Sequence, residues 1–114
     1  MLEPERSDRS RSGIDGSRII LKPGEGLLKE MEQYAARNYV PIVKRDTADL
    51  LIVLGRLIRP VRILEIGTAI GYSAILLSGI LAPGGRIDTI ERDESMAAKA
   101  HDYIKRAGLA DTIA

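Results

Sequence analysis

The sequence contains no cysteine, no long apolar run and no excess of charge of one sign. Without cysteine the chain can form no disulfide and use no thiolate chemistry, which fits a reducing cytoplasm. Charge or glycine interrupts each apolar run well before the length of a membrane span, and the first residues lack the apolar core of a signal peptide. We therefore expect a soluble cytoplasmic protein that has no membrane partner.

The charges nearly balance, because 17 Lys and Arg stand against 16 Asp and Glu. Residues 1–18 are rich in Ser, Gly and charged residues and show no apolar periodicity, so we expect a flexible tail there. An arm that binds phosphates would carry charge of one sign. The tail does not, since its basic residues are offset by acidic ones: Arg6, Arg9, Arg11 and Arg18 against Glu3, Glu5, Asp8 and Asp15.

The most informative stretch runs from Arg62 to Ser73 and reads RILEIGTAIGYS. It predicts a strand, a tight loop and the N-terminus of a helix. Gly67 permits a turn that a Cβ atom would obstruct, and Gly71 is expected to let backbone approach a ligand closely. The free N–H groups of the new helix would point at whatever lies above the strand end. An α/β protein holds nucleotide-like ligands at this place.

The spacing of the glycines excludes two familiar phosphate-binding loops. A dinucleotide fingerprint needs G-x-G-x-x-G, but Ala69 occupies the middle glycine position, and the Gly-Lys-Ser/Thr of a P-loop is absent. Residues 86–91 predict the next parallel strand. Glu91 ends it, roughly 20 residues after the glycine loop, where an acid accepts hydrogen bonds from both hydroxyls of an adenosine ribose. The pattern therefore predicts a nucleoside-binding loop.

Helical periodicity surrounds this motif. Apolar spacing predicts helices at about residues 24–38, 47–58, 71–81 and 93–107. The second is expected to begin at a cap formed by Asp46 or Thr47, and Asp93 is expected to cap the last, which stops at Gly108. His101 lies beside the apolar stripe of the last helix and is expected to be a solvated surface residue. The second helix carries its own apolar stripe of Leu50, Leu51, Leu54, Leu57 and Ile58.

Residues 111–114 resemble the opening of a further strand. Parallel sheets normally contain several strands and are covered on both faces. We therefore predict an α/β chain that forms the first part of a doubly wound domain, truncated, with exposed apolar surface and a tendency to self-associate.

The motif also carries a family resemblance. Residues 64–73 (LEIGTAIGYS) followed by 89–92 (TIER) resemble motif I and the acid after it in S-adenosylmethionine-dependent O-methyltransferases related to catechol and caffeoyl-CoA O-methyltransferases. Residues 34–35, 40–43 and 107–109 extend the resemblance, in particular to bacterial tRNA 5-hydroxyuridine methyltransferases. The resemblance implies that residues 19–114 form the N-terminal, cofactor-binding half of a Rossmann-like methyltransferase domain, commonly a homodimer.

The resemblance further implies a binding site for S-adenosylmethionine. Glu91 would hold the ribose, Ser73 would lie near the methionine end, and the backbone of Val43 would contact the same end. The implied set is Val43, Glu65, Gly67, Thr68, Gly71, Tyr72, Ser73 and Glu91. The family also uses Mg²⁺, but its ligands belong to later aspartate motifs that this sequence does not contain. No catalytic and no metal-binding residue is therefore predicted.

Other interpretations of these residues stay open. Glu65 would also fit a buried carboxylate that accepts backbone N–H groups, Tyr72 a core residue, and Glu91 a surface charge paired with Arg92. Ser73 would fit a first-turn hydroxyl, and residues 41–43 a packed linker.

Three functions follow from the sequence. The first is an O-methyltransferase whose acceptor is the hydroxyl of a small aromatic molecule or of tRNA 5-hydroxyuridine. The second is a non-catalytic nucleoside-binding or dimerising module, and the third, which the glycine spacing disfavours, is a nicotinamide oxidoreductase. A basic surface for tRNA would draw on Lys44, Arg45, Arg56, Arg59 and Arg62.

Overall fold

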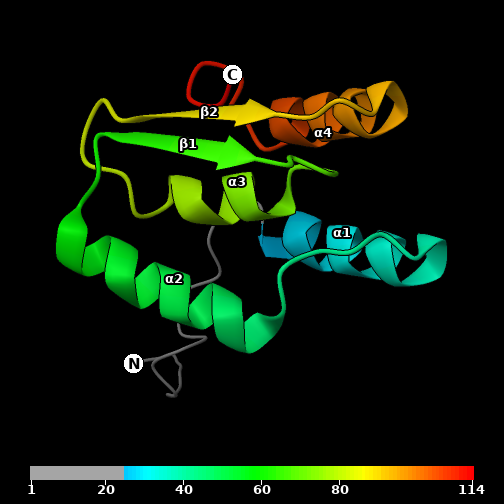
Figure 1. The fold of residues 1–114 in the computed structure, drawn as a ribbon, viewed down its shortest axis with the longest axis horizontal. Helices are drawn as coiled ribbons and strands as arrows, with labels where there is room; N and C mark the ends of the chain where they lie inside the picture. Colours follow the sequence, from blue (N-terminus) through cyan, green and yellow to red (C-terminus); the bar gives the residue numbers. More distant parts are fainter. Residues whose placement is uncertain (1–24) are drawn as a thin grey trace, which may run out of the picture.

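The computed structural model describes residues 25–114 as an open parallel sheet with helices packed against it. In Figure 1, α3 lies between the sheet and α2. The predicted tail and the apolar residues 19–21 lie outside the described part. The elements are α1 (Glu25–Asn38), α2 (Arg45–Ile58), β1 (Arg62–Ile66), α3 (Tyr72–Ser78), β2 (Arg86–Ile90) and α4 (Glu94–Arg106).

The sheet confirms the predicted parallel strands. β1 and β2 pair in a register that runs from Arg62 opposite Arg86 to Ile66 opposite Ile90. The end of the chain adds a third parallel segment on the other edge of β2, through a bridge between Ile113 and Ile87. The Ile87 N–H donates to the Thr112 carbonyl at 2.9 Å. The predicted opening of a further strand is therefore confirmed.

The core lies on one side of this sheet. Met31, Ile70, Ile87 and Tyr103 are its largest fully buried side chains. Burial alternates along β1, so that alternate residues face the core. Leu64 on the opposite face is 67% exposed. The expected exposed apolar surface is thus present. It lies on the face of the sheet that a second layer of helices would normally cover.

Helix α2 differs from its prediction in two respects. It begins at Arg45 and has Lys44 at its N-cap position, without a side-chain cap. The expected cap is wrong because Asp46 already lies in the first turn, where its Oδ1 accepts the adjacent Thr47 N–H. Ala48 and Gly55 are the buried residues of this helix. Most of the predicted stripe is exposed instead: Leu50, Leu54, Leu57 and Ile58.

Helices α3 and α4 follow the predicted pattern more closely. Helix α3 ends at Ser78, earlier than expected, and residues 79–85 form the turn that leads to β2. Asp93 caps α4 as predicted, because its side chain accepts the N–H groups of Ser95 and Met96. Gly108 has a positive φ of 74° directly after α4, which is the conformation expected of a C-terminal stop. His101 is exposed.

Gly55 allows α2 to approach the segment that follows α3. A Cβ atom at this position would lie 2.5 Å from Cδ1 and 2.7 Å from Cγ1 of the buried Ile80. We expect Gly55→Ala to lower the free energy of unfolding by about 1 kcal/mol, because overpacking costs ~1–3 kcal/mol while alanine gains ~1 kcal/mol of helix propensity. Urea denaturation of the purified variant measures the difference.

Gly26 provides the matched control for this experiment. It lies in α1, and a Cβ atom there would have no neighbour within 4 Å. Gly26→Ala should therefore leave the stability unchanged or raise it by up to about 1 kcal/mol. A Gly55→Ala variant as stable as Gly26→Ala would show that Ile80 gives way and that the contact is not tight.

Candidate functional site

The glycine loop joins β1 to α3 in a backbone conformation that few residue types adopt. Gly67, Ala69 and Gly71 have φ values of 93°, 49° and 91°. The N–H groups of Gly67 and Thr68 donate to the carbonyl of Ile90 at 2.8 and 3.1 Å, which ties the loop to the end of β2. A Cβ atom on the exposed Gly67 would meet nothing within 4 Å. The predicted turn is confirmed, and backbone is accessible above the end of β1.

Gly71 ends the glycine loop and lies close to α4. It is buried, and a Cβ atom there would lie 3.4 Å from the Cβ of Ala100 in α4. That distance is an ordinary van der Waals contact, so the positive φ of 91° accounts for glycine at this position. Gly71 also occupies the N-cap of α3, where no side-chain oxygen accepts the first N–H groups of the helix. Its place in the cofactor site stays a prediction.

Glu91 faces the glycine loop from the end of β2. Its Oε1 accepts the N–H of Ala69 at 2.8 Å, and its Oε2 accepts the N–H of Asp93 at 3.0 Å. These backbone N–H groups hold the pKa of the Glu91 carboxyl below its usual value. Each oxygen of an ionised carboxylate has more than one acceptor direction, so both remain able to accept a further hydrogen bond. The arrangement presents a negative charge and free acceptors beside the exposed loop.

A chain of hydroxyl groups lies beneath the loop and meets at Glu65 of β1. Ser73 of α3 donates to Glu65 Oε2, and Thr89 of β2 donates to Glu65 Oε1 at 2.9 Å. The Oγ1 atoms of Thr89 and Thr68 are 2.6 Å apart. Thr68 is only 5% exposed. Glu65 thus accepts side-chain hydroxyls, whereas the sequence suggested backbone N–H groups as its alternative partners.

Thr89 is a site residue that the sequence analysis did not select. The parallel register places it directly opposite Glu65. A signal was available, because residues that end neighbouring parallel strands lie at the same edge of a sheet. A threonine before the strand-end Glu91 is, however, also an ordinary strand residue. Only its hydrogen bonds to Glu65 and Thr68 distinguish Thr89 from such a residue.

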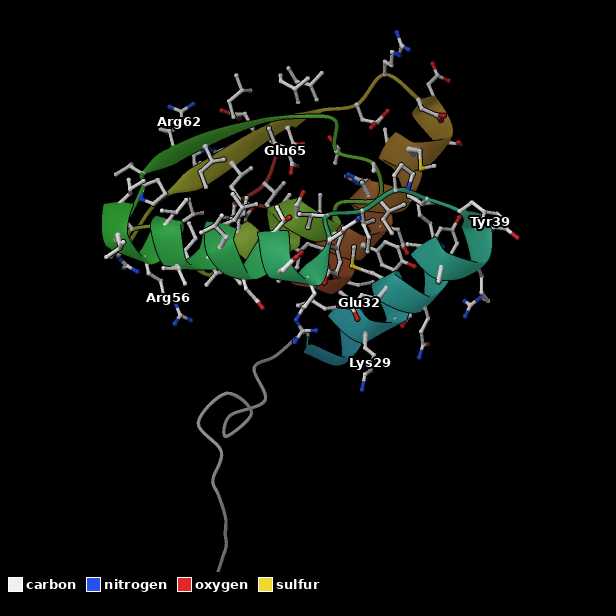
Figure 2. The ribbon with its side chains drawn as sticks, turned by 60° about the horizontal axis from the view of Figure 1, so that its bottom comes forward. Lys29, Glu32, Tyr39, Arg56, Arg62 and Glu65 are labelled. Atoms are coloured by element: carbon white, nitrogen blue, oxygen red, sulfur yellow. The ribbon has the colours of Figure 1, made fainter. Side chains whose placement is uncertain are left out.

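Tyr72 connects the start of α3 to α1. Its side chain is buried, and its hydroxyl donates to Glu32 Oε2 at 2.5 Å. Burial, followed by the hydrogen bond to the Glu32 carboxylate, raises the pKa of Tyr72 to about 12. Figure 2 shows Glu32 on α1 and Glu65 in the sheet. The structure favours the interpretation of Tyr72 as a core residue, and its place in the cofactor site stays a prediction.

The connector between α1 and α2 contains the remaining predicted residue. Val43 is half-buried and packs against the hydrophobic core. Tyr39 begins this connector with a φ of 56° and is 92% exposed. Figure 2 shows its side chain projecting from the end of α1. The packing of Val43 fits the linker interpretation, and its contact with a cofactor stays a prediction.

The basic residues considered for tRNA do not form one free positive surface. Arg45 lies 3.8 Å from the carboxylate of Asp49, and Arg62 lies 2.8 Å from that of Asp88. Figure 2 shows Arg56 on α2 and Arg62 at the start of β1, pointing in different directions. Part of the positive charge is therefore offset by neighbouring acids.

The described residues do not provide a binding site for the metal that the resemblance implies. Between residues 25 and 114 there is no group of three or more His, Asp or Glu side chains that could hold a metal ion. These residues therefore do not fit a Mg²⁺ site. In the same part of the chain, no helix combines the length and apolarity needed to cross a membrane.

Comparisons with known proteins agree with this geometry. A family model described as O-methyltransferase matches residues 22–114. The human protein named transmembrane O-methyltransferase is 46% identical over 87 residues, which are 75% of this chain and 30% of that protein. A protein named catechol O-methyltransferase from Niastella koreensis is 38% identical over 71 residues, covering 62% of this chain and 32% of the relative.

Solved structures give the same result for the fold. An O-methyltransferase from Bacillus cereus, solved in complex with SAH, superposes with a TM-score of 0.71 at 35% identity, over 86% of this chain and 44% of that structure. The O-methyltransferase TomG from Streptomyces achromogenes, solved with SAM, also gives 0.71 at 35% identity, over 87% and 44%. These neighbours share the Rossmann-like methyltransferase fold.

The chain spans about a third of these curated relatives and less than half of these solved structures. The residues matched by the family model, 22–114, include the glycine loop, β2 and Glu91. The chain therefore belongs to the O-methyltransferase family.

Proposed function

We propose that the chain binds S-adenosylmethionine at the glycine loop and serves as the cofactor-binding part of an O-methyltransferase. The observation that carries this proposal is the position of Glu91 beside the accessible backbone of Gly67. An acidic side chain at the end of the second strand is the group that accepts ribose hydroxyls in nucleoside-binding α/β folds. Solved neighbours that contain SAH or SAM support the choice of cofactor.

The carboxylate of Glu91 is suited to this task. Its pKa is lowered by the N–H groups of Asp93 and Ala69, so the acceptor is ionised in the neutral range. The same two hydrogen bonds fix its orientation, which reduces the entropy lost when a ligand binds. In the proposal, the ribose hydroxyls bind Glu91, and the methionine end extends toward Ser73 and the backbone of Val43.

Methyl transfer requires mainly alignment from the protein. The sulfonium of the cofactor is already an activated methyl donor, and fixing an acceptor oxygen in line with the methyl group can supply ~7–11 kcal/mol. We propose the hydroxyl of a small aromatic molecule as the acceptor, because some relatives carry the name catechol O-methyltransferase. The ion pairs of Arg45 and Arg62 make tRNA the second choice.

Calorimetric titration of S-adenosylhomocysteine into the purified chain tests the proposal. We expect saturable binding of one ligand per chain, and no comparable binding of NADH, because the loop lacks the dinucleotide glycine spacing. Circular dichroism and light scattering establish that the chain is folded and of known size. A folded chain that binds NADH but not S-adenosylhomocysteine would replace the proposal with an oxidoreductase.

A nucleoside-binding or dimerising module is the second candidate. The exposed apolar residues favour it, since large exposed apolar patches mark interaction surfaces. These residues lie on α2 and on the sheet, and include Leu57 (77% exposed) and Ile66 (73% exposed). A stable dimer that binds S-adenosylhomocysteine would favour this candidate if it also transfers no methyl group from S-adenosylmethionine to catechol when Mg²⁺ is added.

A further inference from the structure

The hydroxyl chain beneath the glycine loop connects three elements through one residue. Thr89 of β2 bonds to Glu65 of β1 and to Thr68 of the loop, and Glu65 in turn bonds to Ser73 of α3. Thr89 is the member that contacts both the strand and the loop. Its side chain is half-buried beneath the loop.

The direction of each hydrogen bond in this chain can be determined. A hydroxyl has one hydrogen, and a carboxylate only accepts. Since Thr89 donates its hydrogen to Glu65, its oxygen accepts the hydrogen of Thr68 at 2.6 Å. The hydroxyl hydrogens of Thr89 and Ser73 are thus directed at Glu65, and that of Thr68 is directed at Thr89. These hydrogen bonds therefore hold the side chains of Thr68 and Ser73 in one orientation.

We propose that Thr89 is a positioning residue for the cofactor, acting through Thr68 and through Glu65 on Ser73. The proposal rests on the proposed function, because Ser73 is taken to lie at the methionine end. Without the Thr89 hydroxyl, the nearly buried Thr68 hydroxyl loses its acceptor and Glu65 loses one of its donors. Unpaired buried polar groups are unfavourable, so the loop and Ser73 would then adopt other orientations.

The test begins with Thr89→Val, which keeps the shape of the side chain and removes the hydroxyl. We expect its affinity for S-adenosylhomocysteine to fall by about five- to tenfold, because a loop that the Thr89 hydroxyl no longer holds must be ordered when the ligand binds. Thr89→Ser, which restores the hydroxyl, should return the affinity to within about twofold. Thr112→Val is the matched control. Thr112 lies in the segment that pairs with the other edge of β2, and its hydroxyl takes no part in the hydrogen bonds around Glu65.

A double-mutant cycle separates positioning from a general loss of stability. In the Ser73→Ala background, Thr89→Val should weaken binding by less than half of its effect in the original chain, because the group that it positions is gone. Equal effects in both backgrounds, or an equal loss in Thr112→Val, would overturn the proposal. Unchanged affinity in Thr89→Val would overturn it as well.

Amide hydrogen exchange of the ligand-free chain distinguishes a failure of this proposal from a failure of the proposed function. The N–H of Gly71 donates to the Thr68 carbonyl at 2.9 Å and reports on the loop. We expect it to exchange faster in Thr89→Val and at the original rate in Thr112→Val. Unchanged exchange in Thr89→Val would contradict the proposal, whereas an original chain that does not bind S-adenosylhomocysteine would contradict the proposed function.

Discussion

Glu91→Ala is expected to weaken the binding of S-adenosylhomocysteine by about a hundredfold. Hydrogen bonds to a charged group contribute ~1.5–3 kcal/mol each, and 1.4 kcal/mol corresponds to a factor of ten in affinity. The proposed site uses Glu91 for both ribose hydroxyls, so the loss should be among the largest of any single substitution. The variant also releases the N–H of Ala69, which has a left-handed backbone conformation. Isothermal calorimetry of both chains measures the difference.

Glu94→Ala is the control, because Glu94 is an exposed carboxylate only three residues away, in the first turn of α4. Its affinity should equal that of the original chain, whereas Glu91→Gln should fall between the two. An affinity of Glu91→Ala within twofold of the control would show that Glu91 does not hold the ribose.

The pH dependence of binding offers a separate check. The pKa of Glu91 lies below its usual value because the N–H groups of Asp93 and Ala69 stabilise the carboxylate. A lowered pKa means that the contribution of this carboxylate to folding is present above the unfolded value and is lost as the pH falls through the folded value. The same carboxylate stays ionised from pH 8 to about pH 5.5. We therefore expect the affinity for S-adenosylhomocysteine, measured by calorimetry, to be constant over this range.

Tyr103→Ala is expected to lower the free energy of unfolding by about 3–5 kcal/mol, the usual cost of removing a buried aromatic side chain. Tyr103 is 1% exposed and lies in α4 at the centre of the core. Its ring meets that of Tyr34 of α1 edge to face, with centroids 6.3 Å apart. The ammonium of Lys99 lies 5.1 Å from the same ring. Urea denaturation followed by circular dichroism measures the loss.

Tyr39→Ala is the matched control for this core substitution. Tyr39 is 92% exposed and lies outside the packed helices, so its removal should change the stability by less than about 0.5 kcal/mol. Tyr103→Phe keeps the ring and should cost far less than Tyr103→Ala. A Tyr103→Ala variant that loses less than about 1 kcal/mol would show that α4 does not depend on this side chain.

The exposed apolar residues have a consequence for these measurements. Leu64 of β1 and Leu54 of α2 are among those exposed. Because such surfaces promote association, the apparent stability of the chain should depend on its concentration. Denaturation at several concentrations therefore accompanies each stability comparison.

Local patterns in the sequence determined the secondary structure around the glycine loop and the two ends of α4. Apolar runs and glycines predicted β1, the loop and α3, because strand and turn preferences act over a few neighbouring residues. The cap at Asp93 and the stop at Gly108 were also predictable, since the groups that they satisfy lie within one helical turn. The spacing from the loop to Glu91 was enough to predict the candidate binding residue.

Tertiary structure decided the features that depend on distant parts of the chain. Gly71 and Ala100 come close together only when α4 folds back against the loop, so the local sequence could not predict this proximity. The exposure of Leu57 depends on which surfaces meet α2, and the periodicity of a helix does not specify its partner. The same holds for Thr89, which lies opposite Glu65 because the two strands pair in one register. Sequence thus determined the local elements and the strand-end acid, and packing in three dimensions decided which side chains share the site.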